Sequence, residues 1–257
     1  MRNFILSLVL VGVAGAPVTL LADDQCGGGR TTVVFVRSDL ASLKKNLVAA
    51  IAAVPVPDAP YGRESEDWNL PSYACQDKEG IEPVDASYRT RFSTEGAMQQ
   101  KGADYQKAML EAQAKGDYEA LMKINQQMQA EIMQQAAANQ QLRPVELAAH
   151  INDYASATID PDAVLRDGPG FIAIRTDQDL NDGTERVSVY FDPVELKDAQ
   201  EVASFEFPSS YRALGKLDIL NLRVEISGPV AAVEKMVKGI EAQTILQTLT
   251  GARKQAK

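Results

Sequence analysis

The stretch "LNLRVEISGPVAAVEKMVKGI", residues 220–240, joins a strand pattern directly to a helix pattern. Apolar and polar residues alternate in its first part, which predicts a strand with one buried face. The apolar positions are Leu220, Leu222, Val224 and Ile226. After Pro229 the apolar positions Val233, Val237 and Ile240 recur at helical spacing. We therefore expect a sheet that is covered by a closing helix over residues 227–249.

The same reading extends along the chain in both directions. Further strands are expected at residues 33–36, 86–92, 145–151, 171–176, 186–191 and 202–207. After the first of these, which we expect to be buried, leucines at helical spacing predict a helix that ends at Pro55. The predicted fold class is α+β, with a mixed or antiparallel sheet covered by the N- and C-terminal helices.

An antiparallel helical hairpin is predicted over residues 94–141, inserted between two of the strands. Gly116 suits the left-handed end of the first helix, and Asp117 suits the N-cap of the second. At 100° per residue, one apolar face on each helix forms the expected contact between them. On the first helix this seam comprises Met98, Gly102, Tyr105, Met109 and Ala112, with Gly102 allowing close approach. On the second helix it comprises Leu121, Ile124, Met128 and Ile132.

A second, thinner apolar ridge lies outside this seam and consists of Leu110, Met122 and Met133. A two-helix hairpin needs only one seam, so the ridge must meet something else. Two alternatives remain from the sequence: the protein's own sheet, or a partner chain or apolar ligand. Methionine adapts to varied surfaces, which makes the three residues candidates for partner binding.

Residues 55–84 are rich in Pro, Asp and Glu and show no periodicity. They predict a long irregular loop, a kind of segment that often carries function. The loop contains the only tryptophan, Trp68. Trp68 is either a second candidate for partner binding or the side chain that packs this loop onto the body.

The N-terminal residues 1–22 have the pattern of a secretory signal peptide. Arg2 precedes an apolar run that is too short to span a membrane, and small residues follow it. We expect residues 23–257 to form one mature α+β domain without a membrane span. The expected location is periplasmic or extracellular.

Only two cysteines occur, Cys26 and Cys75. In an oxidising compartment an even pair predicts a disulfide. Closing a loop of about 50 residues would stabilise the fold by roughly 4 kcal/mol in the chain-entropy model.

The string "RTDQDLNDGTER", residues 175–186, is a weak metal candidate. Asp177, Asp179 and Asn181 match the first oxygen positions of a calcium loop, but Asp182 and Ser188 occupy positions that need Gly and Glu. The alternative is a β-hairpin with a two-residue turn at 182–183. That register would pair Asp179 with Arg186. It would also place five apolar residues on one face, namely Ile172, Ile174, Val187, Val189 and Phe191.

The sequence contains no catalytic motif that stands up to inspection. His150 is the only histidine, and no G-x-S-x-G string exists. The acidic string "ESED", residues 64–67, has no second placed carboxylate beside it. With 35 acidic against 26 basic residues, the chain should repel nucleic acid.

Taken together, these features predict a non-catalytic binding protein of the cell envelope. It would bind a protein partner or a ligand through the helical hairpin or the 55–84 loop, and no cofactor is expected. The alternative is a carboxylate-based hydrolase that acts on a cell-wall or sugar substrate. The sequence does not determine the oligomeric state.

Overall fold

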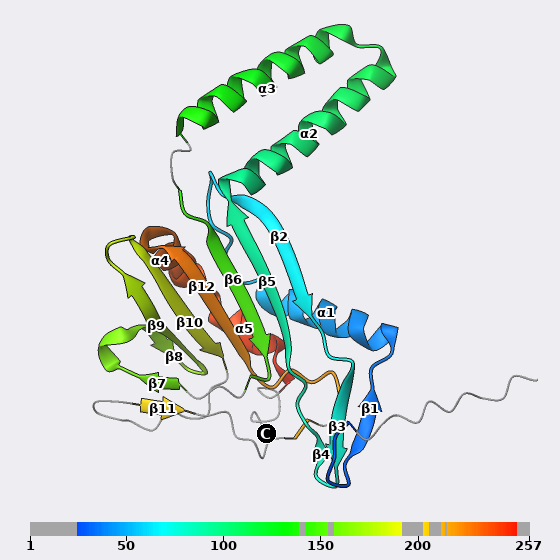
Figure 1. Cartoon of the computed structure of the whole chain (residues 1–257), viewed down its shortest axis with the longest axis vertical. Coiled ribbons are helices and arrows are strands. Elements are labelled where there is room, and N and C mark those ends of the chain that lie inside the picture. Colours follow the sequence, from blue (N-terminus) through cyan, green and yellow to red (C-terminus); the bar gives the residue numbers. More distant parts are fainter. Residues whose placement is uncertain are drawn as a thin grey trace, which may run out of the picture.

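The computed structural model describes residues 25–138, 142–153, 157–191, 203–205, 212–213 and 215–250. The side chains of 131–138, 157–159 and 203–205 are not among the described atoms. The protein is a mixed α+β structure with a large antiparallel sheet, as the sequence predicts (Figure 1). Within the described residues, no helix combines the length and apolar character that a membrane span requires.

The main sheet has seven strands, and every neighbouring pair is antiparallel. In spatial order they are β2 (Gly62–Asn69), β5 (Ala86–Ser93), β6 (Val145–Ile151), β12 (Leu222–Pro229), β10 (Thr184–Phe191), β9 (Phe171–Asp179) and β8 (Val164–Gly168). Strand β12 lies at the centre, where buried and half-buried residues alternate along its length. This alternation follows the pattern expected from the sequence and directs Leu222, Val224 and Ile226 into the core.

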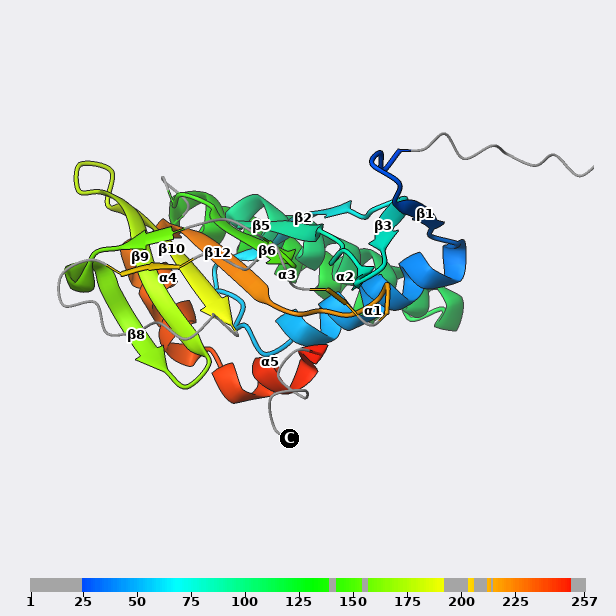
Figure 2. The ribbon, with the colours of Figure 1, turned by 90° about the horizontal axis from the view of Figure 1, so that it is seen from below.

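Three helices share the core with one face of the main sheet (Figure 2). They are α1 (Arg37–Ile51), α4 (Val230–Gly239) and α5 (Ala242–Thr248). Buried apolar side chains of each helix join the strand residues in a single cluster, including Leu47 of α1, Met236 of α4 and Ile245 of α5. On the other face, a small cluster around Ile172 and Ile174 is packed by Ala163, Val164 and Tyr190.

Two smaller sheets flank the main one. The first has the antiparallel order β1 (Thr31–Val34), β3 (Tyr73–Asp77) and β4 (Gly80–Ile81). The second pairs β11 (Ala203–Phe205) with β7 (Ala157–Ile159), and a short 3-10 helix, Pro161–Ala163, follows β7. The strand expected at 33–36 occurs slightly earlier, at Thr31–Val34, and belongs to a side sheet. Its expected burial is wrong, because Val34 is exposed.

The prediction of an irregular loop over residues 55–84 is wrong. Strands β2, β3 and β4 occupy half of this segment. Strand β2 is an edge strand whose backbone pairs with β5, while most of its side chains are exposed. Charged residues suit such an edge because they discourage pairing with other chains. The acidic composition therefore gave no sign of strand β2, which forms by pairing with β5.

The expected single closing helix is divided into α4 and α5. Ile240 has extended backbone angles, and Arg166 reaches the end of α4 from strand β8. Its Nη1 donates to the carbonyl oxygens of Val237 at 3.1 Å and Ile240 at 2.9 Å. The N–H of Glu241 donates to the carbonyl of Ala53 at 3.4 Å. These tertiary hydrogen bonds replace the bonds that a continuous helix would have made.

The expected register of the β9–β10 hairpin is also wrong. Thr184 pairs with Asp179, so residues 180–183 form the turn in place of a two-residue turn. The Asp179 carboxylate accepts from the N–H groups of Asn181 at 2.9 Å and Asp182 at 3.2 Å, which stabilises this longer turn. A bulge after Arg186 shifts the pairing again. Because a one-residue shift exchanges the faces of a strand, Ile172 and Ile174 lie on the face opposite Val187, Val189 and Phe191.

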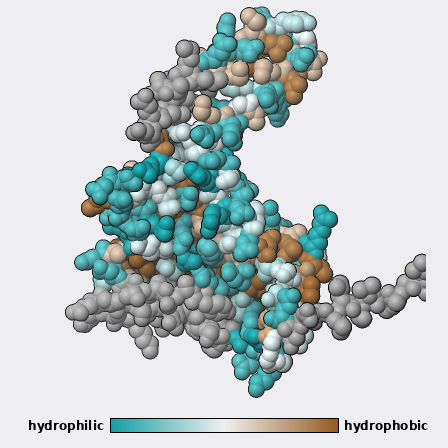
Figure 3. Space-filling model, in the orientation of Figure 1, coloured by the Kyte–Doolittle hydropathy of each residue, from teal (hydrophilic) through white to brown (hydrophobic). Residues whose placement is uncertain are grey.

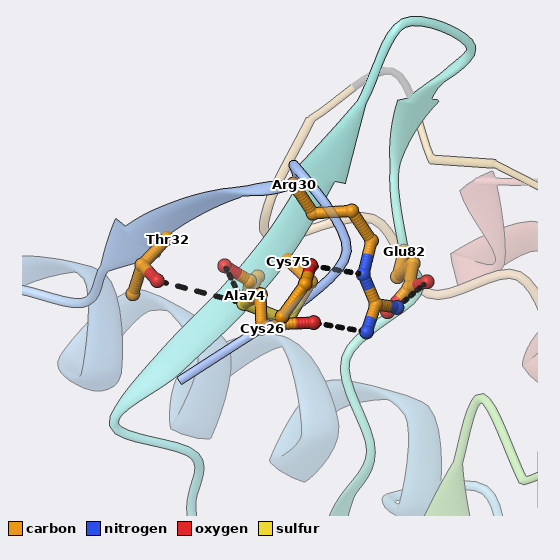
Figure 4. The surroundings of a disulfide bond; sticks show 7 residues. Cys26, Arg30, Thr32, Ala74, Cys75 and Glu82 are labelled. Carbon is orange, nitrogen blue, oxygen red and sulfur yellow. Dashed lines mark hydrogen bonds and ion pairs between the residues drawn. A yellow bond between two sulfur atoms is a disulfide. The ribbon is translucent and has the colours of Figure 1, made fainter. Parts of the chain in front are cut away.

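The predicted disulfide between Cys26 and Cys75 is confirmed, with Cα atoms 5.6 Å apart (Figure 4). It attaches the first described residues to strand β3, and Cys26 is buried. Arg30 completes the same corner of the molecule. Its Nη1 donates to the carboxylate of Glu82 at 2.7 Å, and its Nη2 donates to the carbonyl oxygen of Cys26.

Candidate functional site: the helical hairpin

The helical hairpin comprises α2 (Thr94–Lys115) and α3 (Tyr118–Ala138), and it stands away from the sheet (Figure 1). It is inserted between β5 and β6, which are neighbours in the main sheet. Helix α2 contacts β2 and β5 at its base, whereas α3 packs mainly against α2. Most of the hairpin surface is therefore separate from the core of the body.

The base of α2 is held by a close approach of two glycines. Ser93 ends β5 and caps the helix, and its Oγ accepts from the N–H of Gly96 at 2.9 Å. A Cβ added to Gly96 would lie 2.4 Å from the carbonyl oxygen of Gly62 on β2. A Cβ on Gly62 would lie 2.4 Å from the backbone of Ala97. Only hydrogen at both positions allows the helix to cross the edge strand at this distance.

The turn between the helices follows from local sequence. Gly116 has φ 68° and ψ 22°, the left-handed conformation that glycine adopts without strain. Asp117 then accepts from the N–H of Ala120 at 2.9 Å and caps α3.

The seam between the helices contains the residues expected from the sequence. On α2, Met98, Tyr105 and Met109 are half-buried and Ala112 is buried, while most intervening residues are exposed. On α3, Leu121, Ile124 and Met128 are half-buried. Ile132 lies outside the described side chains. Gly102 does not mediate a close approach, because an added Cβ there would meet nothing within 4 Å.

One flank of the hairpin exposes large apolar side chains. Leu110 is 67 % exposed, Tyr118 80 % and Met122 63 %. Each lies about 75–120° beyond the seam in the same rotational sense, at 100° per residue. Because the helices are antiparallel, equal offsets of the same sign point to the same side of the hairpin. The space-filling view shows apolar surface near the end of the hairpin that is farthest from the sheet (Figure 3).

Beyond the first turn of α2, the other described residues on this flank are uncharged, and we call this surface the amide flank. Its other exposed members are Gln99, Ala103, Gln106, Gln113, Asn125, Gln126 and Gln129. Beyond the first turn of α2, the described charged side chains point to the outer or opposite side. These are Lys101, Asp104, Lys107, Glu111, Lys115, Glu119 and Lys123. Among the described side chains, the hairpin is therefore asymmetric in charge, and its large exposed apolar residues lie on one flank.

Two of the three ridge residues expected from the sequence, Leu110 and Met122, are on this flank. Met133 lies outside the described side chains. Tyr118 was not among the expected residues, although the same 100° rule places it beside Met122. The absence of charge on this flank could also have been found from the sequence.

Trp68 lies on strand β2, half-buried at the edge of the core. Its ring centroid is 4.4 Å from that of Tyr88, and the ammonium of Lys44 stands 4.3 Å from the Trp68 centroid. The ring is thus in contact with both a strand and helix α1. These contacts favour the reading in which Trp68 packs its segment onto the body.

The acidic residues at 64–67 are engaged with neighbouring groups in the sheet. Glu64 pairs with Arg91 at 3.3 Å. Glu66 pairs with Arg63 at 2.5 Å and accepts from the Tyr88 hydroxyl at 3.2 Å. These contacts provide no argument for acid–base chemistry at this strand.

The weak metal candidates Asp177, Asp179 and Asn181 lie at the end of β9 and in the turn that follows it. Asp177 opposes Arg186, and the Asp179 carboxylate is used by the turn. Among the residues that the structure describes, no group of three or more His, Cys, Asp or Glu side chains could hold a metal ion.

His150 lies on strand β6, half-buried on the sheet face opposite the helices. Burial lowers its pKa, and the neighbouring Arg223 lowers it further. Arg223 pairs with both Asp153 and Glu225, so it already belongs to an ion-pair network. Burial and the charge of Asp153 raise the pKa of nearby Asp85.

The fold and the site together define an α+β protein whose antiparallel sheet carries an inserted, projecting helical hairpin. Comparison with protein-family models, curated proteins and solved structures finds no match to this chain.

Proposed function

We propose that the protein is a non-catalytic binding protein of the cell envelope that contacts a protein partner through the amide flank of its helical hairpin. The observation that carries the proposal is the grouping of Leu110, Tyr118 and Met122 on a flank whose described side chains beyond the first turn of α2 carry no charge. Exposed apolar residues that are scattered singly need no explanation, whereas a grouped set is typical of a contact surface.

The composition of the amide flank supports a protein partner in particular. Protein interfaces are enriched in aromatic residues and methionine, and their centres are depleted in charge. Glutamine and asparagine around the apolar residues can donate and accept hydrogen bonds at the rim. The location in the envelope rests on the N-terminal pattern of residues 1–22 and on the disulfide.

Site-specific photocrosslinking in the cells that make the protein tests this proposal. A photoreactive amino acid at Met122 should give a discrete crosslinked species, because this side chain is exposed on the amide flank. The matched control is Gln127, which is exposed on the opposite flank of the same helix. Equal crosslinking at both positions, or none at Met122, would contradict the proposal.

A further inference from the structure

A second feature of the molecule is a pocket of about 480 Å³ beside the base of the hairpin. Three of its lining side chains, Val56, Pro57 and Tyr61, come from the segment before β2. Phe92 at the end of β5 and Gln100 on α2 add the other sides. The volume lies within the range of small-molecule sites, which often form between structural units.

The charge of the pocket lining differs from that of the chain as a whole. Acidic residues outnumber basic ones along the sequence, yet the lining contains Arg63 and neither Asp nor Glu. The Nη1 atom of Arg63 pairs with Glu66, and this exposed pair is weak. Within the described residues, Nε and Nη2 of Arg63 have no hydrogen-bond partner. These donors remain available to an anion.

The apolar part of the lining combines Val56 and Pro57 with the rings of Tyr61 and Phe92. Phe92 is buried, and the guanidinium carbon of Arg63 lies 6.0 Å from its ring centroid. The hydroxyl of Tyr61 donates to the carbonyl of Arg143 at 3.0 Å, which fixes the position of the ring. The polar groups thus stand beside an apolar wall, so the pocket matches a ligand with two chemically different ends.

The pocket also lies beside the segments that attach the hairpin to the body. Gly62, a lining residue, is in contact with the start of α2 at Gly96. Tyr61 is bonded to Arg143, which lies on the return from α3 to β6. A ligand here would contact the segment that holds the hairpin on the body.

We propose that this pocket binds a small organic anion with an apolar body, its carboxylate or sulfonate held by Arg63 and Gln100 and its body packed on Phe92, Tyr61 and Val56. This site is separate from the amide flank and does not depend on the function proposed for it.

Anilinonaphthalene sulfonate, an aromatic sulfonate whose fluorescence rises on binding, serves as the probe. The folded, disulfide-intact protein should bind one equivalent. Val56→Trp, which fills the pocket from an exposed position, should weaken binding at least tenfold. Arg63→Gln should weaken it by a similar factor, whereas Arg37→Gln, an exposed arginine on α1, should have no effect.

Two further measurements locate the probe and exclude binding to unfolded chain. The side-chain amide resonances of Gln100 should shift on titration, and each variant should retain the wild-type near-ultraviolet circular dichroism. Met122→Ser reports on probe bound at the amide flank and should leave the affinity unchanged. No binding, or binding that survives Val56→Trp, would overturn the proposal. Loss with Val56→Trp but not with Arg63→Gln would overturn the assignment of an anion.

Discussion

The seven-stranded sheet and the helical hairpin bury their apolar residues in opposite ways. In the sheet, Val224 and Phe191 are at most 1 % exposed, because strands on both sides and helices above enclose them. In the hairpin beyond its base, Ala112 is the single buried residue among the described side chains, and the other seam residues are only half-buried. The body therefore encloses an apolar core, whereas most side chains along the hairpin are exposed to solvent.

This difference has a consequence for how each region tolerates change. A residue enclosed on all sides loses both its transfer free energy and its contacts when it is truncated. A residue on the outside of a two-helix arm loses little, because water already reaches it. Substitutions in matched pairs can test whether the two regions differ as much as their burial indicates.

The largest effect is expected in the body. Phe191→Ala should lower the free energy of unfolding by about 3–5 kcal/mol, because the ring is buried and stacks on Phe171. Met122→Ala in the hairpin should change it by less than about 0.5 kcal/mol. Denaturant unfolding with the disulfide intact measures both values. A loss of several kcal/mol at Met122 would mean that the amide flank is covered in the folded protein.

A smaller effect distinguishes the base of the hairpin from its middle. Gly96→Ala should cost about 1–3 kcal/mol, because its Cβ would meet the backbone of Gly62. Gly102→Ala should instead stabilise α2 by roughly 0.5–1 kcal/mol, because the added methyl meets nothing and alanine favours helix. Hydrogen exchange of residues 98–112 measures the local change. Equal destabilisation by both substitutions would show that the middle of the hairpin packs more closely than its geometry indicates.

The smallest expected effect is a pH dependence that belongs to the body alone. The folded-state pKa of His150 is lowered below its ordinary value of 6.5, so the unfolded chain binds the proton more readily. Stability is therefore fully present above pH 6.5 and falls as the pH drops through this value toward the folded pKa.

His150→Gln should flatten this slope, while hydrogen exchange in α2 and α3 should show no matching change. Asp39 and Asp77 affect the stability of the fold in a lower pH range than His150. Hydrogen bonds from Lys216 and Arg212 respectively lower their pKa values below 3.8, so their contribution is lost only in more acidic solution. An unchanged slope in His150→Gln would assign the effect near pH 6 to another group.

The local sequence pattern was sufficient to predict those features whose conformation is determined by one residue and its near neighbours. The alternation in β12, the left-handed turn at Gly116 and the seam around Tyr105 and Leu121 all follow from the sequence in this way. The same applies to the amide flank, because the positions of Leu110 and Met122 around a helix depend on the helical repeat alone.

Tertiary structure decided the features in which distant segments supply the missing partners. Strand β2 exists because β5 provides its hydrogen bonds, and its own residues 62–69 are too polar to predict it. The break between α4 and α5 depends on Arg166, which is more than 70 residues away in the chain. The pocket beside the hairpin likewise combines Val56 with Gln100, and no spacing within either segment encodes that proximity. Sequence periodicity thus determined which faces are apolar, and long-range pairing determined which of those faces the fold encloses.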